Sequence, residues 1–168
     1  MLIEQRIIIK EATASEDFLI AEHFYKMWLD IGFPDDAIAL SASRTRLIAP
    51  DWLNITLQFV EKARRELFYK AFVAEVEGAV VGSASCQLHS GLYPNIIKQE
   101  YRKYGYIWGV YVEPSYRRQG IAKQLTSKAV TYLKEIGCTR VVLNASPLGK
   151  PVYESLGFSS SNGMQLDL

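Results

Sequence analysis

Apolar residues recur along the chain at two different spacings, and each spacing predicts a type of element. Short runs rich in Val, Ile and aromatic residues, bounded by turn residues, predict β-strands. The pair Glu77-Gly78 between two such runs predicts a hairpin turn. The strands expected on this basis are Arg6–Ala12, Tyr69–Val76, Ala79–Leu88, Gly105–Val112 and Arg140–Asn144.

Helical spacing of apolar residues predicts three longer helices. The first follows Thr13 and Glu16, which have the spacing of a capping box, and ends before Gly32 and Pro34. The second spans Asp51–Leu67 and the third Gly120–Ile136, with Gly137 as its stop. The buried faces expected are Phe18, Ala21, Phe24 or Tyr25, Trp28 and Ile31; then Trp52, Ile55, Phe59, Ala63 and Leu67; then Ile121, Leu125, Ala129, Leu133 and Ile136.

The remaining segments predict loops and a short helix. Asp30–Asp51 is loosely patterned, with a short helical piece expected at Ile38–Ala42, and Ser90–Lys103 is polar and predicts a loop. An irregular turn over Ser146–Lys150 leads to a short helix at Pro151–Leu156, because proline is tolerated in a first helical turn. Asn162-Gly163 predicts a hairpin between two terminal strands within Phe158–Leu168.

The element order β-α-α-β-β-β-α-β-α-β-β predicts a single α/β domain over residues 1–168. Its core would be a mixed central β-sheet of about seven strands, flanked by about four helices. A chain of 168 residues with 49% apolar residues is large and apolar enough for such a core.

Composition and charge narrow the possible partners and the location. The net charge of +1 does not indicate a broad nucleic-acid-binding surface. Cys86 and Cys138 fit no metal-binding spacing and no disulfide framework, so we expect reduced cysteines and no metal site. No apolar run has the length of a membrane span, and the N-terminus has no signal pattern. We therefore expect a cytoplasmic protein with neither a membrane nor a nucleic-acid partner.

The stretch from Tyr106 to Ala122 carries the clearest chemical signal. A strand ends near Pro114, and a basic turn with Arg117, Arg118 and Gly120 leads into a helix. Unpaired N–H groups and the positive end of the dipole at a helix N-terminus favour a phosphate, and glycine lets it approach the backbone. The turn lacks the nucleotide-triphosphatase and dinucleotide fingerprints. By itself it fits a phosphate cradle or an ordinary turn with solvated arginines.

Two motifs resemble those of the GNAT superfamily of N-acetyltransferases. Arg117-Arg118-Gln119-Gly120-Ile121-Ala122 matches the signature Arg/Gln-x-x-Gly-x-Gly/Ala, which binds the pyrophosphate of acetyl-CoA in that family. The stretch Asn144–Phe158 resembles the family's second motif, which ends in Tyr…Leu-Gly-Phe. A helix and a strand separate the two motifs, as in the family, and the resemblance covers nearly the whole chain from Arg6.

The resemblance implies the fold of that family and acetyl transfer from acetyl-CoA, as co-substrate, to an amine. Attack would be direct, in a ternary complex, and the acceptor expected is the primary amine of a small molecule. Gly109 is the expected site of a bulge that frees backbone groups for the pantetheine arm. Tyr153 would protonate the departing thiolate. The cofactor-binding residues implied are Val110, Tyr111, Val112, Arg117, Arg118, Gln119, Gly120, Ile121, Ala122 and Asn144.

The sequence leaves the general base and the acceptor open. No acidic residue lies between Gly105 and Val112. Glu113 follows directly after this strand, at a position that is compatible with exposure to solvent. Asp30, Asp35 and Asp36 fall where relatives cover the acceptor site, and His23 and His89 fit structural or solvated roles. A protein or peptide amine is the alternative acceptor. The alternative function is an acyl-CoA sensor without turnover. Exposed sheet edges are compatible with a homodimer.

Overall fold

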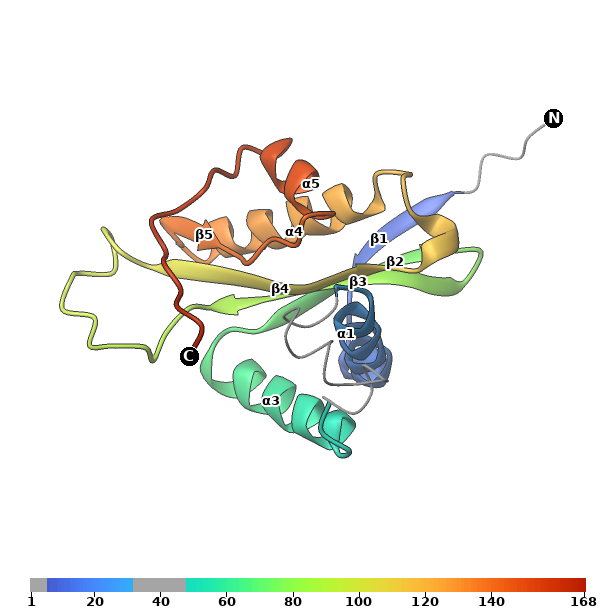
Figure 1. Cartoon of the computed structure of the whole chain (residues 1–168), viewed down its shortest axis with the longest axis horizontal. Helices are drawn as coiled ribbons and strands as arrows, with labels where there is room; N and C mark the ends of the chain where they lie inside the picture. Colours follow the sequence, from blue (N-terminus) through green and yellow to red (C-terminus); the bar gives the residue numbers. More distant parts are fainter. Residues whose placement is uncertain (1–5, 32–47) are drawn as a thin grey trace.

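The computed structural model describes residues 6–31 and 48–168. Within these residues a five-stranded sheet has the order β1-β2-β3-β4-β5 (Figure 1). The first three strand pairs are antiparallel, and β4 and β5 are parallel. The strands are β1 (Ile7–Glu11), β2 (Lys70–Val76), β3 (Ala79–Leu88), β4 (Tyr104–Val112) and β5 (Arg140–Val142).

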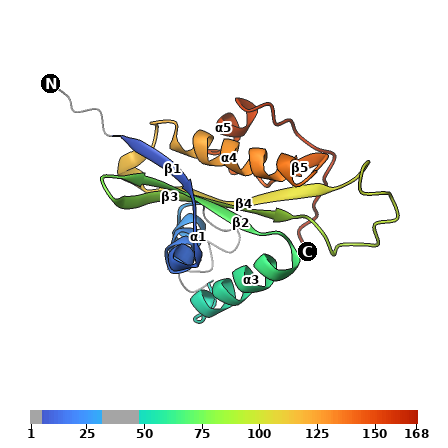
Figure 2. The same cartoon turned by 180° about the vertical axis from the view of Figure 1, so that it is seen from behind.

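Helices cover both faces of this sheet (Figures 1 and 2). One face carries α4 and the short α5, and the other carries α1 and α3. The helices are α1 (Asp17–Ile31), α3 (Trp52–Glu66), α4 (Ile121–Glu135) and α5 (Lys150–Glu154), with 3-10 turns η1 (Ala14–Glu16) and η3 (Pro114–Tyr116). The expected α/β architecture is therefore confirmed, and the element bounds agree to within about two residues. The expected helix at Ile38–Ala42 and the stop at Gly32 and Pro34 lie outside the described residues.

The face under α4 forms the larger hydrophobic cluster. Ile121, Leu125, Ala129 and Leu133 are at most 2% exposed and pack on β2, β3 and β4, as their spacing predicts. Gly105 on β4 lies directly under Leu133, because a Cβ there would approach the leucine Cδ1 to 2.7 Å. This close packing fixes α4, and with it the turn that precedes its first residue, against the middle of the sheet.

On the opposite face, the buried faces of α1 and α3 agree only in part with the spacing: Ala21 and Ala63 are buried as expected, at most 1% exposed. Phe18, Trp28, Ile31, Ile55 and Phe59 were expected inside but are between 40% and 58% exposed. The inward positions go in part to His23 and Thr56, which are at most 7% exposed. Each is satisfied by a hydrogen bond: His23 Nδ1 to the Ser83 hydroxyl at 2.9 Å, and Thr56 Oγ1 to the Trp52 carbonyl oxygen at 2.7 Å. A buried polar side chain is tolerated when it is paired in this way.

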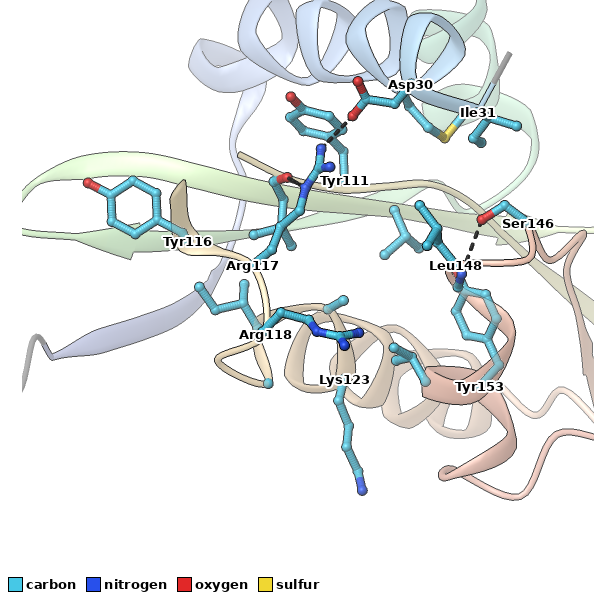
Figure 3. Close-up of a pocket in the computed structure, with 18 of the residues that line it drawn as sticks. Asp30, Ile31, Tyr111, Tyr116, Arg117, Arg118, Lys123, Ser146, Leu148 and Tyr153 are labelled. Atoms are coloured by element: carbon cyan, nitrogen blue, oxygen red, sulfur yellow. Dashed lines mark hydrogen bonds and ion pairs between the residues drawn. The ribbon is translucent and has the colours of Figure 1, made fainter. Parts of the chain in front are cut away.

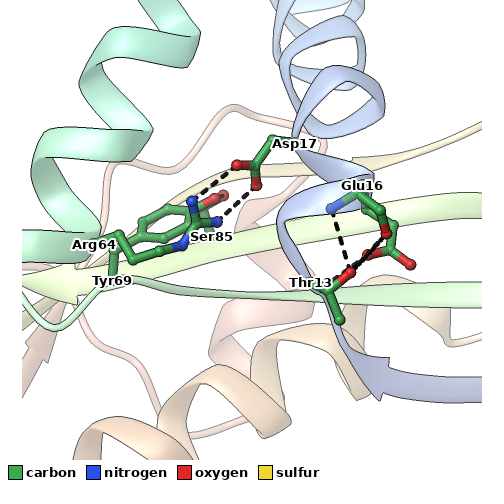
Figure 4. A network of polar contacts seen from close by, with 7 residues as sticks. Thr13, Glu16, Asp17, Arg64, Tyr69 and Ser85 are labelled. Atoms are coloured by element: carbon green, nitrogen blue, oxygen red, sulfur yellow. Dashed lines mark hydrogen bonds and ion pairs between the residues drawn. The ribbon is translucent and has the colours of Figure 1, made fainter.

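Polar contacts hold α1 and α3 together and cap η1, which leads into α1 (Figure 4). The Arg64 guanidinium makes a two-pronged contact with the Asp17 carboxylate, at 2.7 and 2.9 Å. The expected capping box is present, with the Thr13 backbone N–H donating to the Glu16 carboxylate at 2.7 Å. Because a bidentate arginine pair is geometrically specific, α3 has a defined position beside α1.

The expected terminal hairpin is wrong, and the sheet among the described residues has five strands rather than about seven. Residues 158–168 contain a bend at Asn162 but no strand. Met164, Leu166 and Leu168 are at least 82% exposed, so this segment buries too little apolar surface to hold a strand. None of the described helices is long and apolar enough to cross a membrane. The two cysteines are free, and Cys86 is fully buried.

Candidate active site

Strands β4 and β5 separate soon after they meet. Their register covers only Tyr104 to Tyr106 on β4, so the rest of β4 extends beyond β5. On its other edge, β4 has a bulge: Ser83 pairs with Tyr111 and Ser85 with Trp108, so Ala84 faces both Gly109 and Val110. Gly109 has a φ of +62°, which glycine adopts without strain. The bulge expected at Gly109 is confirmed.

The basic turn between β4 and α4 has an unusual backbone. Arg118 and Gly120 both lie in the left-handed region, with φ of +65° and +78°. Left-handed residues next to right-handed or extended ones turn successive N–H groups toward a common centre, which suits an anion. A Cβ on Gly120 would have no described atom within 4 Å, so the space beside the first turn of α4 is open. The backbone here fits a phosphate better than it fits an ordinary strand-to-helix turn.

A cavity of about 420 Å³ joins this turn to the divergence of β4 and β5. Its walls come from the end of α1, the second half of β4, the basic turn, the start of α4, and Ser146 to Tyr153 (Figure 3). The expected site residues that line it are Val110, Tyr111, Val112, Arg117, Arg118, Gly120, Ile121, Ala122 and Tyr153. Residues far apart in the chain are thus brought to one cavity of the size that holds a small ligand.

Two expected cofactor residues lie apart from the cavity lining. Gln119 is an exposed residue of the turn. Asn144 is exposed just beyond β5, and its Nδ2 donates to the Tyr106 hydroxyl at 3.1 Å. Neither position excludes contact with a long ligand, so both assignments stay predictions.

The two arginines of the turn have different surroundings. Arg117 Nε donates to the Val112 carbonyl oxygen at 2.8 Å, its Nη2 contacts Asp30, and its guanidinium lies 5.5 Å from the Tyr111 ring centroid. The Arg118 side chain instead extends across the cavity toward Leu148 and Tyr153 (Figure 3). Arg117 therefore ties the turn to α1, and Arg118 offers its guanidinium to an occupant of the cavity.

This difference gives a testable contrast between the two arginines. Arg118→Ala should weaken acetyl-CoA binding about 10- to 100-fold, since a hydrogen bond to a charged group is worth about 1.5–3 kcal/mol, and should leave stability unchanged. Arg117→Ala should lower the free energy of unfolding by about 1–2 kcal/mol, because it removes a backbone contact and a half-exposed ion pair. Titration calorimetry and urea unfolding of both variants measure these effects. Equal behaviour of the two variants would contradict the assignment.

Tyr153 lies on α5 at the wall of the cavity opposite β4 (Figure 3). Its ring packs against Phe158, with ring centroids 6.0 Å apart, and lies close to Gly149. Burial raises the pKa of the Tyr153 hydroxyl above its ordinary value of 10.0. The hydroxyl therefore stays protonated at neutral pH and is able to donate a proton into the cavity.

Next to Tyr111, which lines the cavity, lies a polar cluster that the sequence did not reveal. Glu113 Oε1 accepts from Lys26 Nζ at 2.7 Å and lies 3.7 Å from His23 Nε2, and Glu113 Oε2 accepts from the Tyr111 hydroxyl at 3.3 Å. Burial opposes ionisation of Glu113, but the hydrogen bond and charge of Lys26 outweigh it, and the pKa of Glu113 is lowered. Burial also opposes ionisation of His23, and it lowers the pKa of His23 although the charge of Glu113 acts in the opposite direction. Glu113 is thus an ion-paired carboxylate and His23 a neutral imidazole.

These contacts bear on the missing general base. A carboxylate that is paired with Lys26 and has a lowered pKa is a weak base. Asp30 is engaged by Arg117, and Asp35 and Asp36 lie outside the described residues. His89 is placed against the Tyr106 ring, with ring centroids 5.4 Å apart. Among residues 6–31 and 48–168, no group of three or more His, Cys, Asp or Glu side chains is arranged to hold a metal ion.

Comparison with known proteins identifies the family. The sequence model of the Acetyltransferase (GNAT) family matches residues 35–158, which is well over half of the chain. The chain belongs to the GNAT family of N-acetyltransferases. The match includes both motifs from which the resemblance was inferred, so that inference, the fold class and the assignment as an enzyme are confirmed.

Relatives of this GNAT protein act on different amines according to their names. It is 33% identical over 123 residues to a glucosamine 6-phosphate N-acetyltransferase of Trypanosoma brucei brucei, covering 71% of this chain and 80% of that one. It is 36% identical over 90 residues to N-alpha-acetyltransferase 30 of Xenopus laevis, covering 52% of this chain and 30% of that one.

A solved structure with the same fold is that of a predicted acetyltransferase with acetyl-CoA from Clostridium acetobutylicum. The TM-score is 0.75 at 22% identity, and 96% of each chain is covered. This likeness extends over nearly the whole chain, so all five strands belong to the shared fold.

Proposed function

We propose that this GNAT enzyme transfers the acetyl group of acetyl-CoA to the primary amine of a small molecule. The observation that carries the proposal is one continuous cavity. It joins the left-handed turn at Arg118 and Gly120 to the stretch of β4 that β5 does not pair and to Tyr153. Acetyl-CoA supplies an activated thioester, and the cavity offers a separate wall for each part of such a molecule.

Each wall has a distinct role in this proposal. The N–H groups from Arg118 to Ala122, the dipole of α4 and the Arg118 guanidinium bind the pyrophosphate. The part of β4 around Val110 and Val112, which β5 does not pair, offers backbone groups to the pantetheine arm. The bulge at Gly109 turns the backbone where an N–H near Val110 would polarise the thioester oxygen.

The reaction itself needs two proton movements. The amine nitrogen attacks the acetyl carbon, a C–N bond forms, and the C–S bond breaks with its electron pair going to sulfur. The amine nitrogen loses one proton to solvent, since Glu113 and Asp30 are both held in ion pairs. The Tyr153 hydroxyl donates a proton to the sulfur, which leaves as a thiol, and Tyr153 regains its proton from water.

A small-molecule acceptor is the reading that the comparisons favour over a protein N-terminus. The relative of which this chain covers 80% is named for a small amino sugar, whereas the match to the N-alpha-acetyltransferase covers 30% of that protein. The sequence had left a sensor that binds acetyl-CoA without turnover as an alternative of a different class. The protonated tyrosine in the cavity favours an enzyme over the sensor.

Cofactor binding should slow hydrogen exchange in one part of the sheet. If β4 pairs with the pantetheine arm, the amides of Val110 and Val112 should exchange more slowly with acetyl-CoA, because an exposed N–H becomes hydrogen-bonded. Hydrogen-exchange mass spectrometry with and without acetyl-CoA measures this. Strand β2, which lies two strands away, is the internal control. Slowing confined to residues before Leu88 would contradict the placement.

The function as a whole is tested by calorimetry followed by turnover. Acetyl-CoA is titrated into the protein, and thiol release is then followed with a panel of primary amines that includes amino sugars, alkylamines and peptides. Binding with thiol release above background on at least one small amine supports the proposal. Binding without thiol release across the panel would favour the sensor.

A further inference from the structure

A second cavity lies between α1 and α3, on the face of the sheet opposite α4. Its volume is about 370 Å³, within the range of small-ligand sites. None of the described residues that line it carries a charge. They are Phe24, Tyr25, Trp28, Ile48, Ala49, Trp52, Ile55 and Thr56. We call this cavity the aromatic pocket.

The walls of the aromatic pocket are organised rather than loosely packed. Tyr25 and Trp52 stack with ring centroids 4.5 Å apart and an interplanar angle of 22°. Phe24 and Trp28 meet edge to face, with ring centroids 6.2 Å apart. Yet Trp28 and Ile55 remain 40% and 49% exposed, although their spacing predicts buried positions. Large apolar side chains that stay open around a formed cavity are typical of a binding site for an apolar group.

The aromatic pocket adjoins the bulge of β4. The Phe24 ring lies 3.5 Å from where a Cβ on Gly109 would be, and 5.1 Å from the Trp108 ring centroid. Trp108 is itself fixed by a hydrogen bond from its Nε1 to Gln87 Oε1 at 3.1 Å. Phe24 thus forms a wall shared by the pocket and the backbone bulge. In the proposed function this bulge is where the thioester lies.

We infer that the aromatic pocket binds the apolar body of the acceptor, and that the preferred acceptors are arylalkylamines. The inference rests on the proposed function, because it uses the placement of the thioester at the bulge. An aromatic ring gains favourable edge and stacking contacts with Tyr25, Trp28 and Trp52. The short alkyl chain then carries the amine past Phe24 toward β4.

The absence of charged side chains from the described walls of the pocket disfavours other acceptors. A sugar phosphate needs cationic or N–H donors for its phosphate, and a polyamine needs carboxylates for its second ammonium group. The described lining has neither a cationic side chain nor a carboxylate, and the Thr56 hydroxyl already donates to the Trp52 carbonyl oxygen. Acceptor preference should therefore differ from that named for the trypanosomal relative.

The test compares two acceptors that share an aminoethyl group, 2-phenylethylamine and ethanolamine, with glucosamine 6-phosphate as an anionic third. Thiol release should give a kcat/KM for 2-phenylethylamine about 10- to 100-fold above that for ethanolamine, as expected for burying a phenyl ring. Glucosamine 6-phosphate should be no better than ethanolamine.

Two variants connect this preference to the aromatic pocket. Ile55→Asp places a carboxylate in the apolar wall at a half-exposed position, and should lower kcat/KM for 2-phenylethylamine about 10- to 100-fold. Asn54→Asp adds the same charge one residue away, outside the pocket lining, and should change it less than about twofold. Ala49→Trp, which fills the pocket, should cause the same selective loss as Ile55→Asp. The dissociation constant of acetyl-CoA should stay at the wild-type value in all three, which also reports that each variant is folded.

The outcomes separate this inference from the proposed function. Thiol release with ethanolamine or glucosamine 6-phosphate, but no preference for 2-phenylethylamine, would overturn the inference and leave the acetyltransferase. Equal effects of Ile55→Asp and Asn54→Asp would do the same. Binding of acetyl-CoA without thiol release from any amine would overturn the proposed function and this inference with it.

Discussion

Gly120→Asp should weaken acetyl-CoA binding by at least about 100-fold while leaving the protein folded. A Cβ at residue 120 meets no described atom within 4 Å, so the new side chain extends into the open space of the proposed phosphate site. Its carboxylate repels the pyrophosphate and competes for the N–H groups of the turn. Removing such contacts and adding a like charge together cost about 3 kcal/mol or more, which corresponds to that loss of affinity. Titration calorimetry measures the change.

Gly120→Asn is the matched control for this variant. Residue 120 has a φ of +78°, and asparagine and aspartate tolerate this left-handed region better than most residues. Both variants therefore carry a similar backbone strain and a similar volume, and they differ in the charge. We expect the asparagine variant to lose no more than about tenfold in affinity. If the aspartate variant is folded and binds acetyl-CoA like the wild type, the turn does not bind the pyrophosphate.

Tyr153→Phe should reduce the single-turnover rate of acetyl transfer by about 10²–10⁴-fold, the usual worth of a general acid. The substitution removes the hydroxyl and keeps the ring that packs against Phe158, so stability and acetyl-CoA affinity should change little. The hydroxyl matters when charge develops on sulfur, so the loss appears in the rate and not in the dissociation constant. Rapid-quench measurement of a single turnover isolates this step from product release.

Tyr116→Phe provides the control, because Tyr116 also lines the cavity but points away from its interior (Figure 3). It should keep the wild-type rate. Because burial raises the pKa of Tyr153 above 10.0, its acid form is present at neutral pH and is lost only as pH rises through the raised value. The wild-type rate should therefore show no decline from this group below about pH 10. An unchanged single-turnover rate for Tyr153→Phe would assign proton donation to water or to another group.

The contacts of Glu113 and Arg117 could not be predicted from the sequence. Lys26 and Glu113, like Asp30 and Arg117, are 87 residues apart in the chain. No local pattern links them, because their contact depends on how α1 crosses β4. The sequence therefore left Glu113 without a partner, whereas the fold places it among Lys26, His23 and Tyr111.

The sequence by itself determined the family and, among the described residues, the elements from β1 to α5. Strands and helices follow from local spacing, turn residues and caps, and the phosphate turn is a contiguous stretch whose glycine and arginines act through backbone geometry nearby. The bulge at Gly109 and the turn at Gly120 were identifiable for this reason, because each depends only on a local positive φ. The motif ending at Phe158 was likewise readable, because α5 and its flanking turns are short and local.

Tertiary structure alone decided which face of each helix is buried and what the faces enclose. Helical spacing identifies an apolar stripe, but α1 and α3 carry more large apolar residues than one stripe needs, so spacing did not fix their rotation on the sheet. The structure buries His23 against Ser83 and leaves Trp28 and Ile55 around the aromatic pocket. The terminal segment shows the same limit, because Asn162-Gly163 favours a turn locally but strands form only where an edge and a buried face are available.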